Sequence, residues 1–342
     1  MNQSRILSVV ALLASGHVLG GCVTTVQDES EGSSAQAQEA LEFGVYSYDV
    51  TGFLVQTLGR GLNGRSLNGT LLDGRVVKYA SLDGARLGAA PLTDVTLEAT
   101  VFAGRVAGHK KISGRRFEGV VLPAVLDDGS SVDLQIDAIS PNPDPANKDV
   151  NLFQVSYATT DGQKPLCGTD ADGQAIAAIP LSGRPDTSVG VPGGGGWVND
   201  PGVATFACLG YAVAKCVEFG YKPWREGKVC VKGGGCTKIT FADHFVACTR
   251  MLRADYCGDG QSHTVDGTEI NFYDAFGIQL DGADWPLEAE WTASGARCAV
   301  RPRVESLPLP WCWASLQDDR CGDVAHYADG TLLMSEVKPT GM

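Results

Sequence analysis

The residues best suited to acid–base chemistry are three polar side chains in the C-terminal half of the sequence. His244 and Asp255 offer a base and a carboxylate that could orient it, and His263 follows shortly after. If one helix carries the first two, they share a face but lie about 16 Å apart, whereas a working pair needs about 3 Å. Any hydrolase would therefore have to assemble in the loop after Cys257.

A nucleophile for that hydrolase is not marked by any motif. Ser262 and Thr264 lie in the loop, but the sequence has no Gly-x-Ser-x-Gly elbow and no His-Glu-x-x-His pair. Polar residues near helix ends commonly satisfy backbone groups instead. Asp255 is suited to accept hydrogen bonds from a turn at 258–260 or to pair with a neighbouring arginine. We therefore favour a protein without enzymatic activity, with the hydrolase as the alternative.

Metal and cofactor sites are not predicted. Residues 170–173 (DADG) begin like a calcium loop but lack its later ligands and terminal glutamate, so turn formation explains them better. The cysteine spacings do not match those of zinc sites. The glycines at 193–196 are not followed by the Lys and Ser or Thr of a phosphate-binding loop. We expect no cofactor and no metal.

Tryptophan is concentrated in the C-terminal half, which holds all of the chain's 6 tryptophans. Trp311 and Trp313 flank Cys312 and follow Pro308 and Pro310, an arrangement that could present a platform to a carbohydrate or a peptide. Tryptophan also packs well around disulfides, and most of these rings are expected to do so. If the protein has a carbohydrate or protein ligand, the sequence places it at this platform.

Composition and charge exclude several classes of protein. The 342 residues include 27 Lys and Arg against 40 Asp and Glu, a formal charge of −13, so no nucleic-acid partner is expected. With 44% hydrophobic and 20% charged residues, the chain is neither wholly disordered nor a coiled coil. The length suffices for roughly two domains with a sizeable core.

Residues 1–21 have the pattern of a secretory signal, with a short positive segment and an apolar run of about 15 residues, too short to span a bilayer. They lead into Leu19-Gly20-Gly21-Cys22, which resembles the lipobox of bacterial lipoproteins. The resemblance implies cleavage before Cys22, acylation with chains such as palmitate, and a lipid bilayer as partner. Val23 in place of Asp implies the outer membrane or cell surface, on its periplasmic or extracellular side. An ordinary signal cleavage site with a chance Cys is the alternative.

Two segments of different character follow the signal. Residues 22–42 are polar and predict a flexible tether, and residues 43–115 predict a β-rich region with a five-residue repeat. A period of five excludes one continuous helix or strand and suits short extended pieces separated by glycine turns. The array resembles pentapeptide-repeat β-helices, and a glycine-turned β-meander is the alternative. The apolar repeat positions are Leu62, Leu67, Leu72, Val77, Leu82, Leu87, Leu92, Leu97 and Phe102.

Further along the chain, hairpins give way to two helices. Strands at 120–126 and 131–139 flank Asp-Asp-Gly, which predicts a hairpin, and another strand is expected at 153–158. The apolar segment 205–219 is predicted to be a buried helix. A second helix is predicted at 241–256, and a glycine follows each helix as a C-terminal cap.

The cysteines predict a disulfide framework. After Cys22 an even number remain, which fits five disulfides in an oxidising compartment. Because the cysteines of the two expected helices have similar spacings, two antiparallel helices could be joined by two bridges. The expected pairs, chosen from many possible arrangements, are Cys208–Cys257, Cys216–Cys248, Cys230–Cys236, Cys312–Cys321 and Cys167–Cys298.

The segment 253–260 (RADYCGDG) resembles the ADYC domain, a family of largely myxobacterial secreted proteins and lipoproteins. Supporting stretches include 165–173 (PLCGTDADG), 208–224 (CLGYAVAKCVEFGYKPW) and 288–298 (EAEWTASGARC). The resemblance covers about residues 120–300. It implies fold and location more than activity, and it assigns no catalytic residue.

These patterns together predict an α+β protein. After the β-rich region we expect a disulfide-stapled α+β domain at 116–304 and a cysteine-containing tail at 305–342. The expected function is that of an envelope-anchored lipoprotein with a structural or ligand-binding role. A protein-binding or inhibitor module is a further alternative beside the hydrolase.

Overall fold

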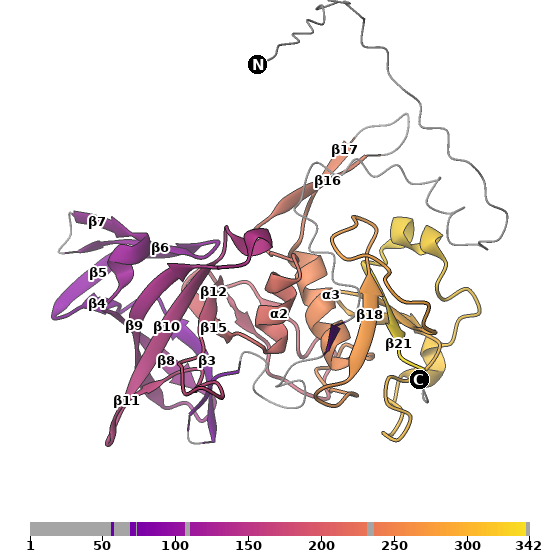
Figure 1. The fold of residues 1–342 in the computed structure, drawn as a ribbon, viewed down its shortest axis with the longest axis horizontal. Helices are drawn as coiled ribbons and strands as arrows, with labels where there is room; N and C mark the ends of the chain where they lie inside the picture. The colour runs from indigo at the N-terminus through magenta and orange to yellow at the C-terminus, as the bar shows by residue number, and fades with distance from the viewer. Residues whose placement is uncertain (1–55, 58–68, 73, 107–109, 231–235, 340–342) are drawn as a thin grey trace, which may run out of the picture.

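The computed structural model describes most of the chain after residue 55 (Figure 1). The described ranges are 56–57, 69–72, 74–106, 110–230 and 236–339. The expected signal, Cys22 and the tether lie outside them. The structure is 41% strand and 14% helix, so the protein is mostly β. This finding corrects the expected α+β class with its helical head.

A closed antiparallel barrel of six strands forms one part of the fold. β8 and β9 are the hairpin expected around Asp-Asp-Gly, and β10 contains the next expected strand, so these predictions are confirmed. The barrel closes because β3 pairs with β8 on one side and with β15 on the other. The strands in order around the barrel are β3 (Arg75–Ser81), β15 (Val203–Cys208), β12 (Ala178–Ser182), β10 (Asn151–Thr159), β9 (Ser131–Pro141) and β8 (Val120–Leu126).

Alternation of side chains explains how the barrel closes over an apolar core. In β8 the first, third, fifth and seventh residues are buried, as expected when one strand face points inward. In β10, Phe153 belongs to the barrel core, whereas the neighbouring Leu152 belongs to the core beneath the helices. The rings of Phe102 and Phe206 lie 5.6 and 6.2 Å from that of Phe153. One residue of register thus decides which core a side chain joins.

An arm of short strands extends from β8 and carries later positions of the five-residue repeat, whereas the first described position, Leu72, lies on β2 (Leu71–Leu72), which pairs with β3. All these pairings are antiparallel, so the described part of the repeat is built from antiparallel strands and the β-helix prediction is wrong there. Repeat positions nevertheless point inward, since Leu72, Leu92 and Phe102 are all buried. The elements of the arm are β4 (Arg86–Leu87), β5 (Ala90–Glu98), β6 (Val101–Val106), β7 (Lys110–Ser113) and η1 (Gly114–Phe117).

Two helices pack against the barrel. α3 (Ala242–Arg253) confirms the second expected helix except at its end, where Ala254 adopts a left-handed conformation (φ 52°). The expected helix at 205–219 is wrong in its first half, which is strand β15; α2 (Ala212–Glu218) begins only after Gly210. Every residue of β15 is buried, so the segment lacks the alternation that identifies a strand. No helix in the described part of the chain is long and apolar enough to cross a membrane.

A five-stranded antiparallel sheet covers the helices on the side away from the barrel (Figure 1). A second core, which includes Trp291 and Phe272, lies between this sheet, the helices and the barrel. The strands in order are β1 (Gln56–Thr57), β18 (Glu269–Tyr273), β21 (Leu333–Val337), β19 (Leu287–Thr292) and β20 (Gly295–Ala299). Smaller elements are β11 (Gly162–Pro165), β13 (Arg184–Pro185), β14 (Trp197–Val198), β16 (Glu226–Cys230), β17 (Cys236–Thr240), η2 (Pro145–Asn147), η3 (Trp313–Leu316) and η4 (Val324–Asp329).

Disulfides join cysteines throughout the second half of the chain. The described bridges are Cys167–Cys208, Cys216–Cys248, Cys257–Cys312 and Cys298–Cys321, with Cα separations of 5.4, 5.8, 5.6 and 5.8 Å. The pair between α2 and α3 is thereby confirmed, and the expected pairs Cys208–Cys257, Cys312–Cys321 and Cys167–Cys298 are wrong. The helix argument failed because Cys208 lies on β15. The expected bridge Cys230–Cys236 concerns side chains outside the described ones; in the backbone the two residues are Cα partners in the β16–β17 hairpin.

Candidate functional site

No contact in the described structure links the three catalytic candidates to one another. His244 lies on α3, buried among the rings of Phe276, Phe241 and Tyr221, whose centroids are 5.2, 5.4 and 6.1 Å from its own. Its Nδ1 has no hydrogen-bond partner among the described residues. Desolvation lowers the pKa of His244 to about 4, so the imidazole is neutral at physiological pH. His244 is therefore a packing residue of the second core.

Asp255 fixes the turn that follows α3. Its buried carboxylate accepts the backbone N–H groups of Asp259 at 3.0 Å and Gly260 at 3.1 Å. Arg250 donates to it from Nη1 at 2.6 Å. Burial raises the pKa of Asp255, while Arg250 and Arg253 act in the opposite direction. The structural role that the sequence suggested for this carboxylate is confirmed.

The loop after Cys257 also completes the end of the helix. Ser262 Oγ donates to the carbonyl oxygen of Arg253 at 2.9 Å, and the His263 backbone N–H donates to the same oxygen at 3.0 Å. Desolvation lowers the pKa of the His263 imidazole, whose ring lies 6.0 Å from that of Tyr256. Of the two hydroxyls considered as a nucleophile, that of Ser262 is thus engaged with backbone, whereas Thr264 Oγ1 is buried with no hydrogen-bond partner among the described residues.

Tyr256 joins a buried charge network that the sequence did not reveal. Its hydroxyl donates to Glu288 at 2.6 Å and accepts the backbone N–H of Arg303 at 2.8 Å. Glu288 and Arg303 form a two-pronged ion pair, with Nη2–Oε2 at 2.8 Å and Nε–Oε1 at 3.0 Å, and both side chains are fully buried. Ser335 Oγ donates to the same carboxylate at 2.9 Å. Every strong acceptor in the network has a donor, as buried charges require.

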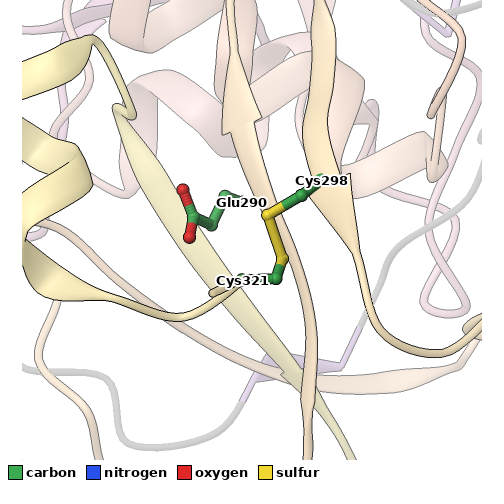
Figure 2. A group of neighbouring side chains, drawn as sticks. All are labelled: Glu290, Cys298 and Cys321. Atoms are coloured by element: carbon green, nitrogen blue, oxygen red, sulfur yellow. A yellow bond between two sulfur atoms is a disulfide. The ribbon is translucent and has the colours of Figure 1, made fainter. Parts of the chain in front are cut away.

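A second buried carboxylate, Glu290, lies beside a disulfide rather than a metal. Figure 2 shows Glu290 with Cys298 and Cys321, whose sulfurs are bonded to each other. Sulfurs in a disulfide are not thiolates, and thiolates are what zinc binds. His326 Nδ1 contacts Glu290 at 2.8 Å and Thr331 Oγ1 donates to it at 2.5 Å. Glu290 therefore has a structural role, as the acceptor of contacts from His326 and Thr331.

The expected tryptophan platform is reduced to one exposed ring. Trp311 is 73% exposed, and its Nε1 donates to Asp259 Oδ2 at 2.9 Å. Trp313 instead packs edge-on against Tyr256, with ring centroids 5.3 Å apart. Trp291 is fully buried. Trp291 is a core residue and Trp313 is half-buried against the same core, so Trp311 alone does not form a two-ring platform.

A pocket of about 330 Å³ lies where the barrel, the arm and α3 meet. Trp197 and Trp224 line it together with Phe245 of α3, and the rings of Trp197 and Phe245 meet edge to face with centroids 5.2 Å apart. The Trp197 indole N–H donates to the carbonyl oxygen of Ser182 at 3.2 Å. The volume lies at the lower end of the roughly 300–1,000 Å³ of small-molecule sites.

The polar lining of this pocket is acidic. Its two acidic residues are Asp200 and Asp243. Asn199 and Ser182 add neutral polar groups. Asp200 accepts the backbone N–H of Gly202 at 3.0 Å, which holds its carboxylate just before β15. Among the described residues that line the pocket, none is Lys, Arg or His.

Sequence reasoning missed this pocket because its walls come from distant segments. The stretch 197–201 (WVNDP) and the pair 223–224 (PW) each contain a tryptophan and a proline, and the first adds an Asn and an Asp. Nothing in their spacing indicates that the two stretches meet beside the start of α3.

The described architecture is a barrel and a sheet joined by two helices and stapled by disulfides. The ADYC domain model matches residues 114–305, more than half of the chain, so the protein belongs to the ADYC domain family. No curated protein and no solved structure matches it. The four residues Ala, Asp, Tyr and Cys that give the family its name all have structural roles here. Ala254 adopts a left-handed conformation at the end of α3, and Asp255 accepts a backbone hydrogen bond in the turn that follows. Tyr256 donates a hydrogen bond to Glu288, and Cys257 forms a disulfide with Cys312 in the C-terminal segment.

Proposed function

We propose that this protein is a lipid-anchored envelope protein whose ADYC domain binds a small ligand without catalysing a reaction. The pocket between Trp197 and Trp224 is the observation that carries the proposal. Small-molecule sites are concave and mostly apolar, with a few polar groups that fix orientation. Aromatic and proline walls with two carboxylates, Asp200 and Asp243, have that composition.

The scaffold around the pocket supports binding because its walls are tied to rigid elements. The bridge between Cys216 and Cys248 joins α2 to α3, the helix that supplies one wall. The hydrogen bond from Trp197 to Ser182 anchors the opposite indole to the end of β12. A wall held in place before binding loses little conformational entropy when the ligand arrives.

The surroundings of the catalytic candidates favour binding over hydrolysis. General base catalysis needs an imidazole within hydrogen-bond reach of a proton in the substrate. His244 is enclosed by aromatic rings and its pKa is lowered to about 4, which makes it a poor base at neutral pH. Ser262 donates its hydroxyl hydrogen to a helix carbonyl.

The envelope location is supported by the signal-like N-terminus and by the disulfides. Four bridges suit an oxidising periplasmic or extracellular compartment. Replacing Cys22 by Ser should move the protein from the membrane fraction to the soluble fraction, because the acylated residue is lost. If the Cys22→Ser protein stays in the membrane fraction as much as the wild type does, the lipid anchor is wrong.

Ligand binding is tested by thermal stability in the presence of two probes, choline and methyl glucoside. A ligand that binds only the folded state raises the melting temperature. We expect one probe to stabilise the wild type and the control Trp311→Phe, and to leave Trp224→Ala unchanged. Equal shifts in wild type and Trp224→Ala, or no shift with either probe, would contradict binding in this pocket.

A further inference from the structure

The charge balance of the pocket points to a class of ligand. Asp243 is exposed in the first turn of α3 and has no hydrogen-bond or ion-pair partner among the described residues. Asp200 keeps its carboxylate beside the pocket through its bond to the Gly202 N–H. Two carboxylates in a small pocket whose described lining holds no cation create a region of negative potential.

The two cations that flank Trp224 in the chain are engaged away from the carboxylates of the pocket. Lys222 and Arg225 flank the Pro223–Trp224 pair, yet both are engaged by Asp149. Lys222 Nζ lies 2.5 Å from Asp149 Oδ1, and Arg225 Nη2 lies 3.0 Å from Oδ2. The carboxylates of the pocket therefore remain available to a ligand.

The start of α3 contributes charge of the opposite sign. A helix N-terminus is equivalent to about half a positive charge. Asp243 lies in that first turn and more than offsets it, and Asp200 adds a second negative charge. The sum stays negative, which disfavours an anionic ligand.

The aromatic walls favour the same sign of ligand as the carboxylates. The faces of aromatic rings carry partial negative charge, and tryptophan attracts cations most strongly. Trp197 and Trp224 provide two such rings in one pocket. A neutral sugar could also stack on an indole, but it would gain nothing from the net charge of the two carboxylates.

We infer that the pocket binds an organic cation, a quaternary or primary ammonium compound, through its two carboxylates and two indoles. The inference rests on the proposed function, because it names the ligand class of the same pocket. The ammonium head would replace part of its hydration shell with indole faces and carboxylate oxygens. No covalent step is involved.

The test compares choline with dimethylbutanol, its uncharged carbon isostere, by titrating the full-length protein in detergent and following tryptophan fluorescence. We expect choline to bind at least about tenfold more tightly than the isostere, because only choline carries the charge. Asp243→Asn should weaken choline binding about tenfold, and the effect should shrink at high salt. Asp172→Asn, an exposed carboxylate in the turn at 170–173, is the matched control and should bind as the wild type does.

Each other outcome has a defined meaning. Equal affinity for choline and its isostere would overturn the cation inference, while leaving the pocket as a binding site. Binding of methyl glucoside without binding of choline would overturn it in favour of a neutral sugar, and the proposed function would stand. If none of the three probes binds, both the inference and the pocket's proposed function fail.

Discussion

The barrel and the C-terminal half of the molecule bury different kinds of side chain. The polar residues buried near the barrel are hydroxyls and one amide: Thr70, Thr100, Asn147, Ser156 and Thr205. All buried Lys, Arg, His, Asp and Glu residues of the described chain lie at position 222 or later: Lys222, His244, Arg250, Arg253, Asp255, Asp259, Asp274, Glu288, Glu290, Arg303, His326 and Glu336. The barrel is thus stabilised by apolar packing, and the second half by charged contacts in addition to its own apolar core.

This difference indicates which kinds of substitution each region tolerates. An apolar core accepts another residue of similar volume at small cost, because dispersion and burial have no direction. A buried charge needs its own partner in the right geometry, as Glu288 needs Arg303. The predictions below therefore place the largest effects in the second half.

Arg303→Ala is expected to be the most damaging change. Among the described residues it leaves the buried carboxylate of Glu288 with Tyr256 and Ser335 as its side-chain donors, which should lower the free energy of unfolding by about 3–5 kcal/mol. Chemical denaturation of the wild type and the variant measures the loss. A loss below about 1 kcal/mol would show that this network does not hold the second half together.

Removal of the Cys257–Cys312 bridge is expected to cost about 3–4 kcal/mol. The bridge closes a long loop, with a sequence separation of 55, and ties the family motif to the C-terminal segment. The double variant Cys257→Ala/Cys312→Ala should unfold at lower denaturant concentration than the wild type. An unchanged midpoint would argue that the segment docks by packing alone.

His244 should make the stability of the second half depend on pH. Its pKa is lowered from 6.5 to about 4 by desolvation, so between these values the unfolded state binds the proton and the folded state does not. The contribution is complete above pH 6.5 and is lost as the pH falls towards 4; the pKa difference of about 2.5 corresponds to about 3 kcal/mol.

The measurement is the pH dependence of the free energy of unfolding for the wild type and for His244→Leu. The variant should lack the loss of stability between pH 6.5 and 4 that protonation of His244 causes. Burial raises the pKa values of Glu218 and Glu336 to about 7, so their contributions have the opposite sign and are lost as the pH rises from 4.5 to 7. These two groups are common to both proteins and cancel in the difference. Parallel pH curves for the two proteins would refute the role given to His244.

Ile136→Val in the barrel is expected to give the smallest effect, about 1 kcal/mol, since it removes one buried methylene. The loss should be the same at pH 5 and pH 8, because no buried Lys, Arg, His, Asp or Glu of the described chain precedes position 222. Denaturation at the two pH values provides the check. A strong pH dependence would show that the barrel is coupled to the charged half.

The sequence predicts the features that depend on local patterns and misses those that depend on tertiary contacts. The β8–β9 hairpin follows from alternation and an Asp-Asp-Gly turn, and the Cys216–Cys248 bridge agrees with the prediction of two antiparallel helices, although the spacing argument fails for Cys208. The sequence predicts a helix over β15 because burial on both faces removes the alternation typical of a strand. The partners of Glu288 and Asp255 depend on tertiary contacts across the chain, although a role for Asp255 in its local turn could be predicted.

The pocket could not be predicted from the sequence because it too depends on tertiary contacts. The pocket lies where the two regions meet: Trp197 and Asp200 come from the loop before β15, and Asp243 and Phe245 from α3. These segments are distant in the sequence and come together only in the folded protein. The pocket thus combines Asp200, which lies next to the barrel, with Asp243 of α3.

The most direct test of the account is the NMR signal of the tryptophan indole N–H groups as choline, and then methyl glucoside, is added. We expect the signals of Trp197 and Trp224 to shift along a saturable curve with one probe, while those of Trp291 and Trp311 stay in place. If neither probe moves the two pocket signals, or if only Trp311 responds, ligand binding between Trp197 and Trp224 is contradicted.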